Sequence, residues 1–177
     1  YLASGAADDA IREFNAALSI EPGNTRASFG LGQAYEQRSK CARVFSYRME
    51  LTTELETIGK LGFPPLTDQG YQDIGLALDA YTRAVASYPP YAGAYYRQGL
   101  LHFVSGRQAE ARTALERAVT EERSSIPPAV LLAYVYLEDG NTQAAAAQIE
   151  RIRSASGDPA NALILGASAA LEFRNGR

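Results

Sequence analysis

Aromatic side chains crowd around the chain's only histidine in one short stretch, YPPYAGAYYRQGLLHFVSG, which runs from Tyr88 to Gly106. Imidazole can act as a general base near neutral pH, and aromatic rings can hold a ligand beside it. The same residues are also typical of a packed core, in which the rings are simply buried. The helix face that each side chain occupies decides between these two interpretations.

His102 lacks the sequence context of a catalytic residue. A Ser-His-Asp triad would have to recruit this one histidine, and the repeat phase derived below places it in the packed interior. No glycine-rich phosphate loop follows a strand, because the sequence shows no strand pattern. We therefore expect a packed His102 with one hydrogen-bonded nitrogen, and a pH-sensitive contact stays as the alternative.

The other reactive side chains are isolated as well. The acidic pairs Asp8-Asp9 and Glu121-Glu122 lie near expected helix ends, where solvated acids are common. Cys41 has only the basic residues 40 and 43 nearby, so a redox or modification role is the alternative to an inert thiol. The sequence predicts a protein that is not an enzyme, with no catalytic residue, no cofactor and no metal site.

Composition and charge narrow the class of partner. The chain has 177 residues, of which 46% are hydrophobic, enough for one domain with a core. Its net charge of −3 gives no reason to expect nucleic acid, and no apolar run reaches the ~18 residues of a membrane span. The lone cysteine excludes an intramolecular disulfide and does not identify the compartment. Both ends fall inside a repeat, so we expect a fragment of a longer protein.

A repeated pattern of small and large residues predicts the architecture. One set begins at Ala77 and continues with large, small and proline residues at positions 81, 84 and 89. Equivalent sets begin at Ala10, Ala111 and Ala145. From Ala77 to Ala111 is 34 residues, and from Ala111 to Ala145 is 34 again, whereas from Ala10 to Ala77 is 67. Such a period indicates a stack of similar helical units.

A second signature marks the helix before these sets. Small residues recur at Gly32, Gly99 and Ala133, and a larger residue follows each one three positions later. Small side chains at such positions let the paired helix approach closely. The sequences SGR at 105–107 and DGN at 139–141 supply glycines that can take a positive φ between paired helices. The pattern therefore predicts helix-turn-helix units.

On these positions the chain resembles the tetratricopeptide repeat (TPR) family, over about residues 1–37 and 68–177. The tryptophan common at the start of the first helix is replaced by Ser28, Tyr95 and Ala129. The resemblance implies an all-α fold, a right-handed α-solenoid of helix-turn-helix repeats with one degenerate or inserted repeat. The expected units are a partial repeat at 1–24, a regular first helix at 25–37, an irregular helix and Pro-rich loop at 38–67, a second helix at 68–91, repeats at 92–125 and 126–159, and a partial repeat at 160–177.

Residues 38–67 fill one period without either signature. Consecutive prolines at 64 and 65 exclude the regular first helix that the phase would place there. A degenerate repeat that keeps the stack continuous and an insertion that contacts a partner are both open interpretations. An apolar stripe at helical spacing predicts one helix in this segment, with Val44, Tyr47, Leu51, Leu55 and Ile58.

One face of the first helices is the candidate binding surface. In proteins that this chain resembles, that face lines the concave side of the superhelix. We expect a groove there for an apolar or amphipathic segment, although individual side chains could instead pack against the neighbouring repeat. The predicted partner-binding residues are Arg26, Phe29, Gln33 and Glu36 in one unit, Tyr96, Leu100 and Phe103 in the next, and Val130, Tyr134 and Leu137 in the third.

The expected function is therefore that of a scaffold or adaptor with a protein or peptide partner. A carboxylate-binding site of the chaperone-binding kind is not expected, because a carboxylate buried against these rings would lose its hydration without a paired cation. Two alternatives stay open. The chain could form homo-oligomers through stacked terminal repeats, or it could be an accessory domain of an enzyme whose catalytic part lies elsewhere.

Overall fold

The computed structural model describes residues 4–39, 67–158 and 160–176. All regular structure within these ranges is helical, as the predicted all-α solenoid requires. The described helices are α1 (Ser4–Ile20), α2 (Thr25–Ser39), α5 (Asp68–Ser87), α6 (Ala92–Val104), α7 (Gln108–Glu121), α8 (Ile126–Glu138), α9 (Thr142–Ala155) and α10 (Ala162–Arg174).

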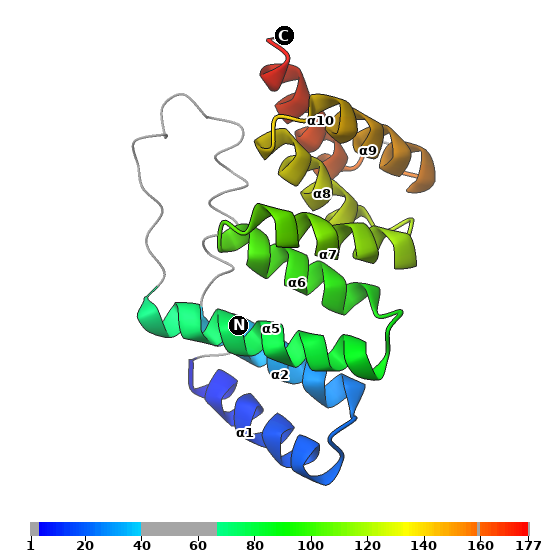
Figure 1. Cartoon of the computed structure of the whole chain (residues 1–177). Helices are drawn as coiled ribbons and strands as arrows, with labels where there is room; N and C mark the ends of the chain where they lie inside the picture. Colours follow the sequence, from blue (N-terminus) through cyan, green and yellow to red (C-terminus); the bar gives the residue numbers. More distant parts are fainter. Residues whose placement is uncertain (1–3, 40–66, 159, 177) are drawn as a thin grey trace.

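The helices stack along one direction, as Figure 1 shows. Helix α2 packs on α5, α6 packs on α7, and α8 packs on α9. Each pair also contacts the next one, through α5 and α6 and through α7 and α8. In this arrangement α2, α6 and α8 are the first helices of successive pairs. We call the side of these three helices that carries the ten predicted partner-binding residues the first-helix face.

Two glycine turns connect the helices of the second and third pairs. Gly106 has a φ of 73° and Gly140 a φ of 75°. Glycine takes this left-handed backbone without the strain that a Cβ atom would add. After the second turn, the Asn141 side chain accepts a hydrogen bond from the Ala144 amide at 3.0 Å and caps α9. The predicted SGR and DGN turns therefore lie where the chain reverses direction between the two helices of a pair.

Close approach within the pairs depends on glycine. A methyl group on Gly32 would lie 2.5 Å from Tyr81 Cε1, and one on Gly99 would lie 2.5 Å from Leu115 Cγ. Both separations are too short for real carbon atoms, so the partner side chain fills the space that the missing Cβ leaves. The small positions found in the sequence therefore bring α2 against α5 and α6 against α7.

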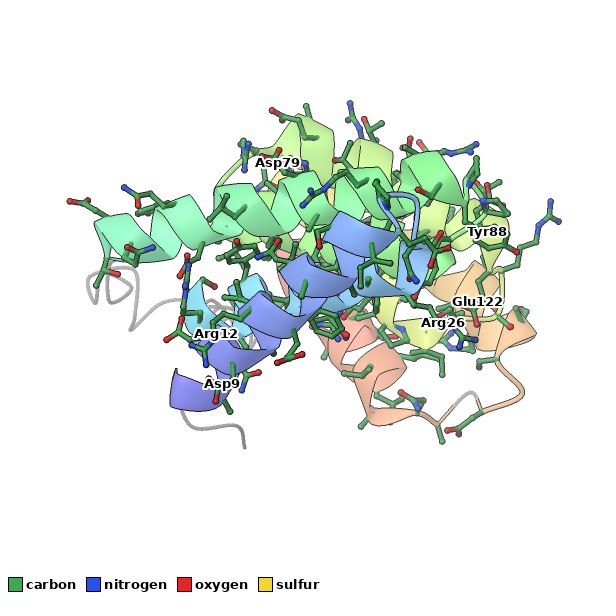
Figure 2. All side chains as sticks on the ribbon, turned by 90° about the horizontal axis from the view of Figure 1, so that it is seen from below. Asp9, Arg12, Arg26, Asp79, Tyr88 and Glu122 are labelled. Carbon is green, nitrogen blue, oxygen red and sulfur yellow. The ribbon has the colours of Figure 1, made fainter. Side chains whose placement is uncertain are left out.

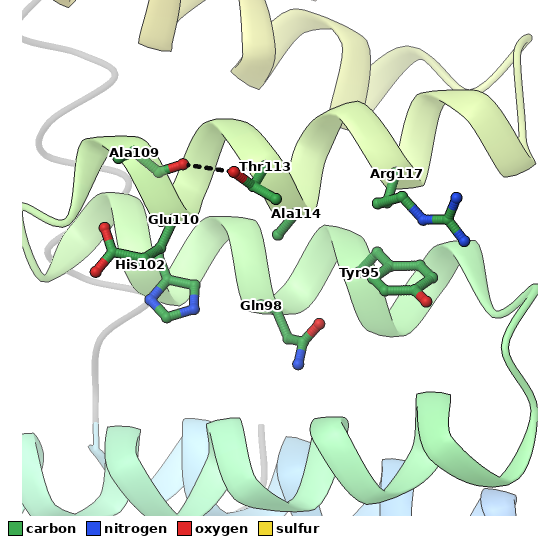
Figure 3. Close-up of a pocket in the computed structure, with 8 residues that line it drawn as sticks. All are labelled: Tyr95, Gln98, His102, Ala109, Glu110, Thr113, Ala114 and Arg117. Atoms are coloured by element: carbon green, nitrogen blue, oxygen red, sulfur yellow. Dashed lines mark hydrogen bonds between the residues drawn. The ribbon is translucent and has the colours of Figure 1, made fainter.

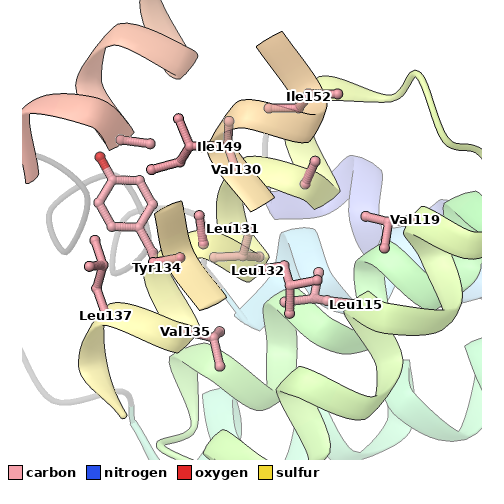
Figure 4. Packing of buried hydrophobic residues seen from close by; sticks show 14 of the residues in the cluster. Leu115, Val119, Val130, Leu131, Leu132, Tyr134, Val135, Leu137, Ile149 and Ile152 are labelled. Carbon is pink, nitrogen blue, oxygen red and sulfur yellow. The ribbon is translucent and has the colours of Figure 1, made fainter. Parts of the chain in front are cut away.

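The apolar core differs between the two ends of the stack. A large cluster joins α6, α7, α8, α9 and α10, and Figure 4 shows its central side chains. At its centre Leu115, Leu132 and Ile152 are no more than 2% exposed. Two smaller clusters lie among the N-terminal helices, one containing Tyr81 and the other containing Leu31. Apolar burial is thus concentrated in the C-terminal helices.

Arg38 connects the N-terminal helices by charge instead. Its guanidinium donates to both carboxylate oxygens of Asp73, at 3.0 and 2.6 Å, and to Asp8 Oδ1 at 2.8 Å. Asp73 is fully buried, and the Gln69 amide donates to it at 3.1 Å. A buried carboxylate needs such donors because water cannot reach it. The hydrogen bonds to Asp73 and Asp8 hold the pKa of Arg38 above its usual range.

Helix α5 begins at Asp68, as the expected second helix does, and ends at Ser87, within the expected range 68–91. Its N-cap is Thr67, whose hydroxyl accepts a hydrogen bond from the Gly70 amide at 3.1 Å. Of the predicted irregular segment 38–67, only residues 38, 39 and 67 are described. Its apolar stripe and its Pro-rich loop therefore lie outside the described residues.

Candidate functional site

The predicted partner-binding residues divide into a buried and an accessible group. In the buried group, side chains of α6 and α8 belong to the large C-terminal cluster, part of which appears in Figure 4. Helix α8, which carries three of these side chains, contacts both α6 and α10. This corrects the expectation that they line an open groove, since they pack against the neighbouring repeat. The residues concerned, each between 2% and 5% exposed, are Leu100, Phe103, Val130, Tyr134 and Leu137.

Glu36 is also buried, and its role is structural. It is 7% exposed, and its carboxylate accepts a hydrogen bond from the Tyr81 hydroxyl at 2.7 Å and another from Arg97 Nη1 at 2.9 Å. These bonds join α2 to α5 and to α6. Removal from water would destabilise the carboxylate without such donors. Glu36 was expected to face a partner in the groove, whereas in the structure it lies buried between α2, α5 and α6.

Arg97 lies beside Glu36 and Tyr96, and it was not among the residues predicted from the sequence. Its guanidinium carbon lies 5.8 Å from the centre of the Tyr96 ring, a cation–π arrangement. Burial acts to lower the pKa of Arg97, but the charge and hydrogen bond of Glu36, together with the neighbouring Tyr81 and Tyr96, raise it, and the net shift is upward. Burial likewise raises the pKa of Tyr96, which packs in part against the C-terminal cluster. Arg97 therefore stays charged and holds the Tyr96 ring in place.

The accessible group lies at the junction of α2 and α6. Arg26 and Gln33 are exposed, whereas Phe29 and Tyr96 are half-buried. The Phe29 ring lies 4.8 Å from the ring of Tyr91, measured between centroids, with an interplanar angle of 37°. Rings of this size offer contact area that is already held in position by their neighbours.

Tyr88 and Tyr91 extend this accessible surface from the turn between α5 and α6. Their ring centroids are 6.3 Å apart at an interplanar angle of 65°, and Tyr88 is 54% exposed. In Figure 2, Tyr88 and Arg26 both lie toward the right-hand side of the molecule. Both tyrosines fall at the end of the expected second helix 68–91, and neither was among the predicted partner-binding residues. The consecutive prolines between them were the available signal, because they hold this segment out of a helix and leave its side chains accessible.

A separate cavity of about 380 Å³ lies between α6 and α7, as Figure 3 shows. It is open to solvent and combines aromatic, amide and charged groups. One end carries His102 and Glu110, and Arg117 stacks over the Tyr95 ring at the other, 5.5 Å from its centroid. The lining residues are Tyr95, Gln98, His102, Ala109, Glu110, Thr113, Ala114 and Arg117.

His102 is half-buried in this cavity, although the repeat phase predicted a packed side chain with one hydrogen-bonded nitrogen. Its Nδ1 atom is buried and makes no hydrogen bond within the described structure. Burial lowers the pKa of His102, Arg107 lowers it further, and Glu110 opposes the shift. No hydroxyl or carboxylate is hydrogen-bonded to the ring in the described ranges, so the geometry gives no sign of a catalytic triad.

The described residues contain neither a cluster of metal ligands nor a helix that could span a membrane. Among them, no three side chains of His, Cys, Asp or Glu type are placed to hold a metal ion. None of the described helices combines the length and the apolar character needed to cross a bilayer.

Comparisons with known proteins agree with the repeat pattern. The sequence profile described as tetratricopeptide repeat matches residues 1–42 and 72–125, more than half of the chain. Among solved structures, a thermophilic TPR protein of Thermus thermophilus is 21% identical, with a TM-score of 0.55 over 95% of this chain and 92% of that chain. No curated protein matches the chain in sequence.

Two further solved structures are similar at lower scores. A tetratricopeptide repeat protein from Parabacteroides merdae is 18% identical, with a TM-score of 0.49 over 97% of this chain and 68% of that chain. MamA from Desulfovibrio magneticus is 16% identical, with a TM-score of 0.45 over 89% of each chain.

Proposed function

Because the chain belongs to the tetratricopeptide repeat family, we propose that it is a non-enzymatic scaffold that binds a protein segment on the first-helix face between α2 and α6. Stacked repeats expose extended surfaces to which an elongated partner can make contacts over several units. The fold fits a protein-interaction role, and the accessibility of the described side chains supports this position of the site.

The observation that supports this position is the difference in accessibility along the first-helix face. Arg26 and Gln33 are exposed and Phe29 is half-buried. The equivalent side chains of α8, Val130 and Tyr134, are only 2% and 5% exposed. A partner can therefore reach the α2–α6 part of the face without displacing the core. Aromatic rings beside arginine and amide groups are typical of protein interfaces.

A capture experiment tests this site. The protein and an Arg26→Ala/Gln33→Ala variant are used as baits in an extract of the source cell. Both side chains are exposed, so the variant should keep the far-ultraviolet circular dichroism of the parent protein. We expect at least one protein to be captured by the parent and lost with the variant. Phe103 is unsuitable for this purpose because it is 2% exposed and its loss would disturb the core.

The matched control changes two exposed residues of α5, as Asp79→Ala/Arg83→Ala. Figure 2 shows Asp79 at a distance from Arg26. The control should capture the same proteins as the parent. Capture that is equal for the parent, the control and the Arg26/Gln33 variant would contradict the proposed position.

Self-assembly is a second candidate function, and α10 supports it. Leu165 and Phe173 are each 52% exposed and lie eight residues apart, about two turns on one side of the helix. Exposed apolar side chains of this size favour contacts with another protein surface. Light scattering over a concentration series should show a rising mass for the parent and a constant mass for Leu165→Ser/Phe173→Ser. A constant monomer mass for both would exclude this candidate.

A further inference from the structure

A series of aromatic rings leads from the core to the accessible part of the first-helix face. Tyr81 is fully buried, and its ring centroid lies 5.4 Å from that of Phe29. Phe29 lies 4.8 Å from Tyr91, and Tyr91 lies 6.3 Å from Tyr88, which is 54% exposed. We call Phe29, Tyr91 and Tyr88 the aromatic ladder. Because Tyr81 anchors its inner end, the ladder is held in position before any partner arrives.

The outer rings of the ladder carry hydrogen-bond donors. Burial raises the pKa of Tyr91, and nearby Arg26 opposes this shift. The Tyr91 hydroxyl therefore keeps its proton at neutral pH. Neither this hydroxyl nor that of Tyr88 takes part in a hydrogen bond recorded for the described residues. Both can donate to a carbonyl group of a partner.

Arg26 adds a positive charge beside the ladder. Its side chain is exposed and forms no ion pair within the described ranges. It is near enough to Tyr91 to influence the pKa of the ring hydroxyl. A carboxylate of a bound segment would complement this charge.

These features fit an extended segment better than an amphipathic helix. A helix would need a broad apolar stripe on the face, and the aliphatic side chains that could supply one, such as Leu100 and Leu137, are buried. A polyproline II segment has no internal hydrogen bonds, so its carbonyls are free to accept from tyrosine hydroxyls. It turns once every three residues and rises about 3.1 Å per residue, so a run of prolines offers a continuous apolar surface to rings whose centroids lie 4.8 and 6.3 Å apart.

We propose that the aromatic ladder binds a proline-rich segment in the polyproline II conformation, with an acidic residue of that segment beside Arg26. This inference rests on the proposed scaffold function and names the chemistry of the partner. Prolines pack against the rings of Phe29, Tyr91 and Tyr88, the tyrosine hydroxyls donate to carbonyls of the segment, and Arg26 binds its carboxylate. The preformed conformation of the segment keeps the entropy lost on binding low.

Synthetic peptides test the inference directly. Fluorescence anisotropy is measured for a labelled peptide of repeated Asp-Pro-Pro units and for two peptides of equal length, one with Lys-Pro-Pro and one with Asp-Ala-Ala units. The Asp-Pro-Pro peptide should bind at least ~10-fold more tightly than either control peptide, because each control lacks one of the two recognised features. Added salt should weaken its binding, since Arg26 is exposed.

Matched variants locate the peptide. Tyr88→Ala should weaken binding of the Asp-Pro-Pro peptide by about 10-fold, and Arg26→Ala should weaken it by about 5-fold. Tyr71→Ala is the control, because Tyr71 lies on α5 and is also 54% exposed. It should bind the peptide as the parent does. Equal binding by the Tyr88 variant, or equal binding of the three peptides, would overturn the inference.

The outcomes separate this inference from the scaffold function on which it rests. If no peptide binds while the protein captured from the extract still requires Arg26 and Gln33, the proline-rich partner is wrong and the scaffold function stands. The same holds if the Asp-Ala-Ala peptide binds more tightly. If capture is independent of Arg26 and Gln33, the proposed position of the scaffold site fails. The inference fails with it unless the Asp-Pro-Pro peptide still requires Tyr88.

Discussion

Between α2 and α6 the first-helix face is bridged by a partly buried ion pair, whereas between α6 and α8 it is filled by apolar side chains. Glu36 and Arg97 form the first junction, at 2.9 Å between Oε1 and Nη1. Leu100 and Phe103 meet the cluster of α8 side chains at the second. The same position of the repeat carries Glu36 in one unit and Phe103 in the next. Equivalent helices are therefore joined by different interactions.

This difference supports the position proposed for the partner site. An ion pair bridges two helices at one point, so rings beside it, such as Phe29, keep accessible surface. An apolar junction is stabilised in proportion to the area that it removes from water, so it closes over the whole face. The polar junction thus leaves side chains accessible, whereas the apolar junction buries them.

Phe103→Ala should have the largest effect on stability. The ring is 2% exposed, and its removal leaves a cavity in the apolar junction, for which we expect a loss of about 3–5 kcal/mol in the free energy of unfolding. Phe173→Ala removes the same ring from a position that is 52% exposed, and it should cost less than about 0.5 kcal/mol. Urea denaturation measures both. Equal losses would show that the α6–α8 junction contributes no special stability.

Arg97→Met should have the next largest effect, about 2 kcal/mol, because it removes the ion pair with the buried Glu36 carboxylate. Combining it with Glu36→Gln should recover part of this loss, since the buried charge is then absent. Arg112→Met is the control, because Arg112 and Asp139 form an exposed pair at 3.5 Å, and we expect a change below about 0.5 kcal/mol. The idea fails if the double variant is less stable than Arg97→Met alone.

Substitutions at the two closely packed glycines should differ less in their effect on stability. Gly32→Ala should destabilise by about 2 kcal/mol, because the Tyr81 ring is held by its bond to Glu36 and cannot move away. Gly99→Ala should cost about 1 kcal/mol, because Leu115 can change rotamer. Gly75→Ala, where nothing lies within 4 Å, should stabilise α5 by about 0.5 kcal/mol. Thermal unfolding of the three variants measures this order, and a reversed order of the first two would contradict it.

The smallest expected effect concerns pH and His102. Burial lowers the pKa of this side chain below its value of 6.5 in the unfolded chain, so the unfolded state gains a proton first as the pH falls. Stability is therefore fully present above about pH 6.5 and is lost as the pH falls toward the folded pKa. His102→Gln should remove this dependence. Urea midpoints at about pH 7.5 and about pH 5.5 should differ in the parent only, since the chain has no other histidine.

The sequence predicted the helical framework well for a physical reason. The small residues Gly32 and Gly99 and the turn residues Gly106 and Gly140 act locally, through contacts and backbone angles that a 34-residue period repeats. Local rules of this kind can be read along the chain. Helices α5 and α6 accordingly begin at Asp68 and Ala92, where the expected units 68–91 and 92–125 begin.

The candidate site was predicted less well. Helical periodicity places Leu100 on the first-helix face, but it does not give the distance to the next first helix, which decides whether that face is open. Glu36 looks like a surface acid in the sequence because Arg97 is 61 residues away. His102 likewise lines the cavity between α6 and α7, and helical periodicity does not give the spacing that leaves this cavity open. Such separations follow from the packing of many side chains together.

The bond between Glu36 and Arg97 also bears on how the molecule unfolds. In a linear array of repeats, each unit can open separately unless its contacts with the next unit are strong. Glu36 bonds to Tyr81 of α5 and to Arg97 of α6, so separating either helix from α2 removes a partner from a buried carboxylate. The three helices should therefore open together, and their backbone amides should exchange with deuterium as one cooperative unit.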